Sequence, residues 1–381
     1  MSAPAVGAEQ EARAGGWALR EWLLVALFYA SYSANTISLT AFDATNAARQ
    51  MDGVLALSDT ATGSLLGLGS TAYLVGKFTA GPVADALGGA PTTSLSLALS
   101  AASLVFLSTS RSLRSLSLGW MVARYAQAAA WPGVMMMTQH AFVGNGLGTA
   151  VGLISTSSRA GAILGNILLG AMLGVGRSWR FVLRAAATWS VIISVLVRVG
   201  DRHCRQLQSS PAVDAGSSLA PGPEQAAAKP TRTPFLKFLS VLARSPRIWL
   251  IYGSNVFATP VFQFASLLPI YLVQDLGLSQ AAASQAAAIF PMASALSILG
   301  STTIWGKLSE PARLVYCATT MAAAVAGMGL IGRVRSTGPL LVSALVLVMA
   351  GTSPTFYLAS GEYLATVGGT RAGTLTAWLD L

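Results

Sequence analysis

The chain has 381 residues, of which 53% are hydrophobic and only 10% are charged, and its mean hydropathy is +0.60. A water-soluble domain needs more surface charge, so the composition excludes an ordinary soluble protein and indicates one that spans a lipid bilayer. The net charge of +10 would suit nucleic acid, but eight of the 24 Lys and Arg residues lie between Arg198 and Arg247. A membrane protein uses such charge for topology, so we expect no nucleic-acid partner.

Residues 1–16 are rich in Ala and Gly and have no apolar core, so we expect a disordered N-terminal tail rather than a signal peptide. Apolar stretches near the spanning length of about 20 residues follow it. They predict ten complete transmembrane helices in an all-α polytopic membrane protein, and the start of an eleventh near Gly373. The ten lie at about 22–42, 62–84, 91–110, 116–142, 147–173, 180–200, 248–274, 283–305, 312–332 and 339–361.

These spans divide the chain into two halves. Residues 17–200 hold six spans, whereas residues 247–381 hold four and the start of a fifth, so we expect an incomplete second half. Residues 201–246 between them are basic and rich in Pro, Ser and Ala, which predicts a partly disordered linker. The positive-inside rule favours a cytoplasmic N-terminus and a cytoplasmic linker. The sequence does not identify the membrane.

A short pattern recurs along the chain and relates the two halves. Gly81 and Asp85 bound a pentapeptide that returns 225 positions later between Gly306 and Glu310. Three further matches keep nearly the same register, namely Tyr29-Ala30-Ser31 with Tyr252-Gly253-Ser254, Pro132 with Pro354, and Gly148-Thr149 with Gly373-Thr374. Such a register predicts two pseudo-symmetric six-helix halves, with the pentapeptide forming a structural or gating turn at the membrane edge.

The same register pairs His140 with Glu362, which lie 222 positions apart at the ends of the fourth and tenth spans. One hypothesis is that the two side chains approach each other when an inner gate closes. The other is that both are solvated helix ends, and the sequence leaves the two open.

Arg159 is the sharpest binding candidate, because it lies about a dozen residues into the fifth span. A cation near mid-membrane costs at least ~2.5–3.5 kcal/mol, so it should face water, a partner or an anion. Helical spacing places Asn166 on the same face, and Gly161 and Gly165 on the opposite face, where small residues permit close packing. The alternative is a structural Arg bonded to backbone carbonyls.

Two further cations belong to the predicted binding set. Lys77 lies in the second span and either reaches the solute or extends to the cytoplasmic surface. Arg124 shares a helical stripe with Gln127 in the fourth span. Arg124 either attracts an anion or forms a structural pair with Asp43, the nearest acid at the membrane edge.

Uncharged polar side chains complete the set: Tyr32 and Asn35 in the first span, and Asn255 and Gln263 in the seventh. Each pair lies at helix-face spacing, and the two spans correspond under the repeat. Polar groups gather in this way along a water-filled path, although any one of them could instead hydrogen bond to a neighbouring helix. As a set they predict a central cavity.

The segment from Tyr73 to Asp85, the pair Trp131-Pro132 with His140, and the segment from Asn255 to Leu272 resemble helices two, four and seven of the major facilitator superfamily. The likeness covers nearly the whole chain and is nearest to the organophosphate antiporter branch. It implies a major facilitator fold whose halves rock about a central site. The sequence departs from this branch in two ways. Sugar-phosphate exchangers typically carry Arg at places that match the surroundings of Thr36 and of Val261 or Phe262, where this chain has none, and the chain also lacks the basic residues that usually follow the Asp85 motif.

Other function classes have little support. The histidines, His140 and His203, lie at a helix end and in the linker, and Cys204 and Cys317 are far apart, so we expect neither an enzyme nor a metal site, and no cofactor. A Walker-type loop is absent from the sequence, so ATP-driven pumping is not supported.

The sequence therefore predicts a monomeric secondary active transporter that moves a small anionic solute, an organic phosphate or a carboxylate, by alternating access. A proton or phosphate is the candidate coupling ion. The alternatives are a non-transporting receptor or scaffold, and a non-functional fragment of a transporter.

Overall fold

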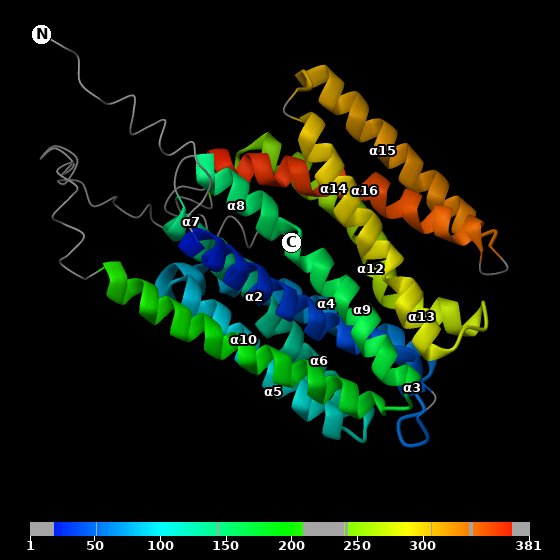
Figure 1. The fold of residues 1–381 in the computed structure, drawn as a ribbon. Coiled ribbons are helices and arrows are strands. Elements are labelled where there is room, and N and C mark those ends of the chain that lie inside the picture. Colours follow the sequence, from blue (N-terminus) through cyan, green and yellow to red (C-terminus); the bar gives the residue numbers. More distant parts are fainter. Residues whose placement is uncertain are drawn as a thin grey trace, which may run out of the picture.

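A computed structural model describes residues 19–50, 52–142, 145–208, 240, 243–305, 307–334 and 338–367. This part of the chain is helical and contains no strand (Figure 1). The first half contains α2 (Leu19–Ala44), α3 (Asn46–Gln50), α4 (Asp59–Leu87), α5 (Gly89–Thr109), α6 (Leu113–Gln127), α7 (Ala130–Ala141), α8 (Asn145–Ser155), α9 (Ser157–Gly174) and α10 (Trp179–Gln208). The second half contains α12 (Pro246–Gln274), α13 (Gln280–Ala287), α14 (Ile289–Trp305), α15 (Glu310–Ile331) and α16 (Pro339–Val367).

The ten predicted spans all correspond to helices, and three of them are divided in two: α6 with α7, α8 with α9, and α13 with α14. Proline accounts for two of the breaks, because it has no N–H to donate to the carbonyl four residues earlier. Pro132 stands four residues after Ala128, where α6 ends, and Pro291 stands four residues after Ala287, the last residue of α13.

Among the described residues, six helical segments are long and apolar enough to cross a membrane, by length and composition. They are Leu19–Gln50, Gly89–Thr109, Trp179–Asp201, Gln280–Trp305, Pro311–Ile331 and Pro339–Phe356. Pro260–Gln274 in α12 is a shorter apolar helical stretch. α10 also runs on to Gln208, so the start of the predicted linker is helical.

The repeated pentapeptide has a different local structure from the one expected. Gly81 and Asp85 lie in the last turns of α4, and the chain reverses only at Gly88, whose φ of +88° is accessible to glycine at little cost. In the second copy, Gly306 lies outside the described residues. Glu310 begins α15, but its side chain is likewise outside them.

Small residues bring the helices of each half close together. A side chain at Gly161 would meet the Ser33 carbonyl of α2, and one at Gly165 would meet Thr40, so α9 packs on α2 through the face that the sequence indicated. In the second half, Gly351 of α16 lies against the Thr320 carbonyl of α15 in the same manner. These contacts fix how each helix is rotated about its own axis.

Hydrogen bonds tie the two halves together near α3, where α2, α9 and α12 end and α13 begins. Ser266 Oγ donates to Asp43 Oδ2 (2.9 Å), Gln274 Nε2 to Gln50 Oε1 (3.1 Å), and Ser284 Oγ to the Asn166 carbonyl (3.1 Å). Figure 1 shows α12 and α13 approaching α9 and α3 at this end. A cavity lies beside this contact.

Candidate functional site

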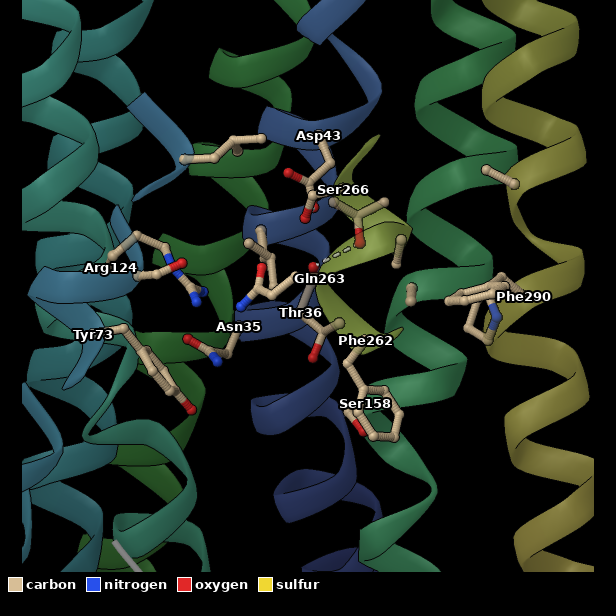
Figure 2. A pocket seen from close by; sticks show the side chains of 18 of the residues that line it. Asn35, Thr36, Asp43, Tyr73, Arg124, Ser158, Phe262, Gln263, Ser266 and Phe290 are labelled. Carbon is tan, nitrogen blue, oxygen red and sulfur yellow. Dashed lines mark hydrogen bonds between the residues drawn. The ribbon is translucent and has the colours of Figure 1, made fainter. Parts of the chain in front are cut away.

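The cavity between the halves has a volume of about 550 Å³. The first half contributes Tyr32, Asn35, Thr36, Leu39, Thr40, Asp43, Leu66, Ser70, Thr71, Tyr73, Leu74, Trp120, Arg124, Ser158, Ala162 and Asn166. The second half contributes Phe262, Gln263, Ala265, Ser266, Ala287, Phe290, Pro291, Met349 and Phe356. Figure 2 shows part of this wall, with Arg124, Tyr73 and Asn35 on one side and Phe262 and Phe290 on the other.

Three of the six strongly apolar segments take no part in the described wall of the cavity. Its described wall comes from α2, α4, α6 and α9 in the first half and from α12, α13, α14 and α16 in the second. α5, α10 and α15 contribute none of these residues and are all among the strongly apolar segments. A helix that faces lipid and its neighbours must be apolar all round, whereas a helix beside a cavity can carry polar groups.

Arg124 brings a positive charge to the cavity wall, and its role in solute binding stays a prediction. Its side chain is only 8% exposed, and Nη1 donates a hydrogen bond to Gln127 Oε1 at 3.0 Å. The guanidinium carbon lies 4.4 Å from the centre of the Tyr73 ring and 5.6 Å from that of Trp120. The aromatic rings hold the charge in place through cation–π contact and leave it beside the cavity.

Asp43 faces the same cavity and meets the second half. Its Oδ2 accepts the hydrogen bond from Ser266, while Oδ1 is buried without a hydrogen-bond partner among the described residues. Arg124 and Arg49 both attract this carboxylate electrostatically. The sequence identified Asp43 only as a partner for Arg124, because spacing along one helix does not show that Ser266 lies opposite.

Arg49 lies behind the wall and close to Asp43, and the sequence reasoning missed it because it is just beyond the first predicted span. It is fully buried in α3, where Nη1 donates to Thr45 Oγ1 at 2.6 Å and Nη2 donates to Asn46 Oδ1. Its guanidinium carbon lies 3.7 Å from the Phe42 ring centre. The one indication in the sequence was that Arg49 follows Asp43 by six residues, so that the two charges could lie close together.

Arg159 lies behind the wall rather than on it. Among the described residues, the wall contains its neighbours Ser158 and Ala162 but not Arg159 itself. Its Nη1 donates to the Ser155 carbonyl (2.8 Å) and to Ser158 Oγ (2.6 Å), and its Nε donates to Ser294 Oγ in the second half (3.4 Å). These hydrogen bonds link α9 to the second half, and a solute-binding role for Arg159 stays a prediction.

Lys77 and Gln127 are also placed behind the wall. Lys77 is fully buried, with Nζ 4.9 Å from the centre of the Tyr73 ring, so it does not extend to a surface. Gln127 is buried, and its Nε2 has no hydrogen-bond partner among the described residues. Both lie close to Tyr73 or Arg124, which do line the cavity.

The predicted polar stripes reach the cavity where the structure describes them. Tyr32, Asn35 and Gln263 line it, and the buried Oδ1 of Asn35 has no hydrogen-bond partner among the described residues. Tyr32 lies against Trp131, with ring centres 4.7 Å apart. Asn255 is in α12, but its side chain is outside the described residues.

Of the predicted inner-gate pair, His140 and Glu362, the structure describes the side chain of His140 alone. His140 is exposed at the end of α7, with Nδ1 2.7 Å from the Met136 carbonyl. It lines a second cavity of about 740 Å³ with Arg20, Glu21 and Asp201. Glu362 is in α16 with its side chain outside the described residues, so the pair stays a prediction. The described part of the chain has no cluster of three metal-binding side chains.

At the end of the first half, Asp52 ties the loop before α4 to the start of α10. Its Oδ2 accepts hydrogen bonds from Trp179 Nε1 (2.7 Å) and Arg180 Nη1 (2.8 Å), and its Oδ1 accepts from the backbone of Val54 and Leu55. Burial by itself raises the pKa of Asp52, but the hydrogen bonds outweigh it and hold the pKa below its ordinary value. The ionised carboxylate therefore stabilises this end of the fold.

Comparisons with known proteins agree with this architecture. A family model described as Major Facilitator Superfamily matches residues 22–380. Two crystal structures of a bacterial homologue of the human lysosomal transporter Spinster, both inward-facing, have the same fold. The unoccupied form has a TM-score of 0.66 at 16% identity, and the occupied form 0.65 at 13%; each match covers 96% of this chain and 79% of the other. A comparison with curated protein sequences found no significant match.

Proposed function

The chain belongs to the major facilitator superfamily, and we propose that this multi-pass membrane transporter carries a small anionic solute, an organic phosphate or a carboxylate, through the cavity between its halves. The superfamily consists of secondary transporters and not of enzymes, as the sequence predicted. The solute's charge, the site residues and the orientation in the membrane belong to the proposal.

The observation that carries the proposal is the buried guanidinium of Arg124 on the cavity wall. Arg124 and Arg49 both attract the carboxylate of Asp43, and Arg124 is the one cation among the described residues of the cavity wall. A buried positive charge is costly unless an anion compensates it. Arginine also presents a planar set of donors that fits carboxylate and phosphate oxygens.

Neighbouring polar groups suit the rest of a small solute. The exposed amide of Gln263 can donate a hydrogen bond to a solute or accept one from it, and Asn35 adds a second amide to the cavity wall. Asp43 offers a carboxylate that can take up a proton, which favours a proton over phosphate as the coupling ion. The organophosphate branch stays a prediction, because Thr36 and Phe262 differ from its pattern.

Alternating access supplies the mechanism. In this conformation the halves are tied near α3 by the hydrogen bonds of Asp43, Gln50 and Asn166. Rocking residues 17–200 against residues 247–381 would break these bonds and expose the cavity on the other side. We place the N-terminus and residues 201–246 in the cytoplasm on the charge distribution alone.

The test is solute counterflow in reconstituted vesicles, together with binding in detergent for a panel of small anions. Arg124→Gln should weaken anion binding by about tenfold to a hundredfold, since a hydrogen bond to a charged group contributes about 1.5–3 kcal/mol. The matched control is Arg114→Gln, which removes an exposed Arg from the same helix and should change neither binding nor counterflow.

Equal anion affinity in Arg124→Gln and the native protein would overturn the assignment. Anion binding that depends on Arg124 without any counterflow would instead support the receptor hypothesis. Thermal unfolding of both variants in detergent establishes that each has kept its fold.

A further inference from the structure

We propose that the transported anion carries one apolar arm, an aryl or short alkyl group, which binds the second half of the molecule while the charge binds the first. This inference rests on the proposed function and extends it, because it names the kind of anion. It follows from how unequally polar side chains are divided between the two walls of the cavity.

The second half offers an apolar surface to the solute. Phe262 and Phe356 lie with ring centres 4.8 Å apart at an interplanar angle of 57°, and both line the cavity. Phe290, Pro291 and Met349 continue this surface. Among the described residues of this wall, Gln263 and Ser266 are the polar ones, and none is charged.

The aromatic pair is open to the cavity rather than filling the core. Phe262 and Phe356 are both half-buried, whereas Phe290 is 1% exposed and packs edge-on against Phe264, with ring centres 6.1 Å apart. Phe262 and Phe356 therefore provide the open part of the aromatic surface, while most of the Phe290 ring belongs to the core of the second half. Apolar rings that face a polar cavity remain in contact with water until an apolar group covers them.

The charged wall and the aromatic wall face each other across the cavity. Figure 2 shows Arg124 and Asn35 on the side of the first half, and Phe262 and Phe290 on the side of the second. A solute that uses both walls must carry its charge at one end and its apolar group at the other. An inorganic anion such as phosphate would leave the aromatic wall uncovered.

The size of the cavity limits the apolar arm. A volume of about 550 Å³ lies within the range of ~300–1,000 Å³ that is usual for sites of small organic ligands. A single ring or a chain of a few carbons fits beside a carboxylate or phosphate group. Each methylene that becomes buried should tighten binding by about fourfold.

The experiment measures binding to the purified full chain in detergent, by calorimetry or thermal shift, for two matched series. The carboxylate series is acetate, butyrate, hexanoate and benzoate; the phosphate series is inorganic phosphate and phenyl phosphate. Benzyl alcohol is the uncharged probe. Native protein should bind benzoate and hexanoate at least tenfold more tightly than acetate, and phenyl phosphate more tightly than phosphate.

Phe262→Ala should remove most of this gain while leaving the weaker binding of acetate or phosphate unchanged. The control is Phe106→Ala, which removes a Phe that is 44% exposed on α5, away from the described cavity wall, and should leave the whole series unchanged. Phe262→Leu retains apolar volume and should restore part of the gain, which separates loss of contact from loss of folding.

The two proposals fail in different ways. Equal affinity for acetate and benzoate would overturn the apolar arm, even if Arg124→Gln still abolished anion binding. If benzyl alcohol bound as tightly as benzoate, the aromatic surface would still be supported as an apolar contact, but the proposal that the solute is an anion would be overturned. If Phe262→Ala still bound benzoate and hexanoate more tightly than acetate by the native factor, the apolar arm would not bind at the Phe262 wall.

Discussion

The two walls of the cavity come from halves that repeat one design, yet they differ in chemistry. Arg124 and Asp43 give the first wall its charges, whereas Phe262 and Phe356 make the second wall apolar. At the repeat offset of 225, the counterpart of Arg124 is Met349, which also lines the cavity. Duplication preserved the positions that face the cavity and left their side chains free to diverge.

Where the halves touch, repeat counterparts meet each other. Asp43 and Ser266 are 223 positions apart, and Gln50 and Gln274 are 224 positions apart; both pairs are hydrogen bonded. Residues related by a pseudo-two-fold axis meet only close to that axis. The contact near α3 therefore lies beside the axis, and the cavity walls diverge from it.

We expect the largest change in the difference between the two walls from Asp43→Asn, which removes the negative charge from the first wall. Without the carboxylate, Arg124 is the one charged side chain among the described residues of the wall, so anion affinity should rise by about tenfold, or about 1.4 kcal/mol. Titration of benzoate at pH 7.5 measures the change. Asp275→Asn, at an exposed position in the second half, is the control and should have no effect.

Unchanged affinity in Asp43→Asn would mean that the carboxylate does not reach the solute. The asymmetry of the walls would then depend on Arg124 alone.

A smaller effect is expected from Arg159→Gln, which tests whether this residue binds solute or joins the halves. Its hydrogen bonds to Ser155, Ser158 and Ser294 place it behind the wall. The solute's Kd should therefore change by less than about twofold, while counterflow should fall by about threefold to tenfold, since one hydrogen bond contributes about 1 kcal/mol to the balance of conformations. A large rise in Kd with normal counterflow would instead support Arg159 as a solute ligand.

The smallest effect is expected at the loop before α4, which Asp52 holds in the first half through Trp179 and Arg180. Asp52→Asn should lower the unfolding temperature by about 2–4 °C at neutral pH. The pKa of Asp52 is lower in the folded protein than in the unfolded chain, so its contribution is complete above the unfolded pKa and is lost as the pH falls through the folded one.

The difference in unfolding temperature between the native protein and Asp52→Asn should therefore stay constant from pH 7 to about pH 5 and shrink below about pH 4. A difference that grew on acidification would contradict the assignment. Thermal scans in one detergent across this pH range measure it.

Much of the fold was available from the sequence because a membrane helix must be apolar over about 20 residues, and that requirement is local. The ten spans, the repeat register and the packing face of Gly161 and Gly165 all follow from spacing along the chain. Tyr32, Asn35 and Gln263 were also predicted to reach the cavity, because polar side chains in a membrane helix seldom face lipid.

The positions of the cations relative to the cavity depended on the tertiary structure. Helical periodicity states which residues share a face, but the rotation of that face relative to the cavity is set by contacts such as Gly161 with Ser33. A rotation of one residue, about 100° around the helix, exchanges Ser158 for Arg159 on the wall. The sequence thus determined which helices cross the membrane and how they repeat. Only the packing of those helices decided that Arg124 faces the solute cavity while Arg159 and Lys77 stand behind it.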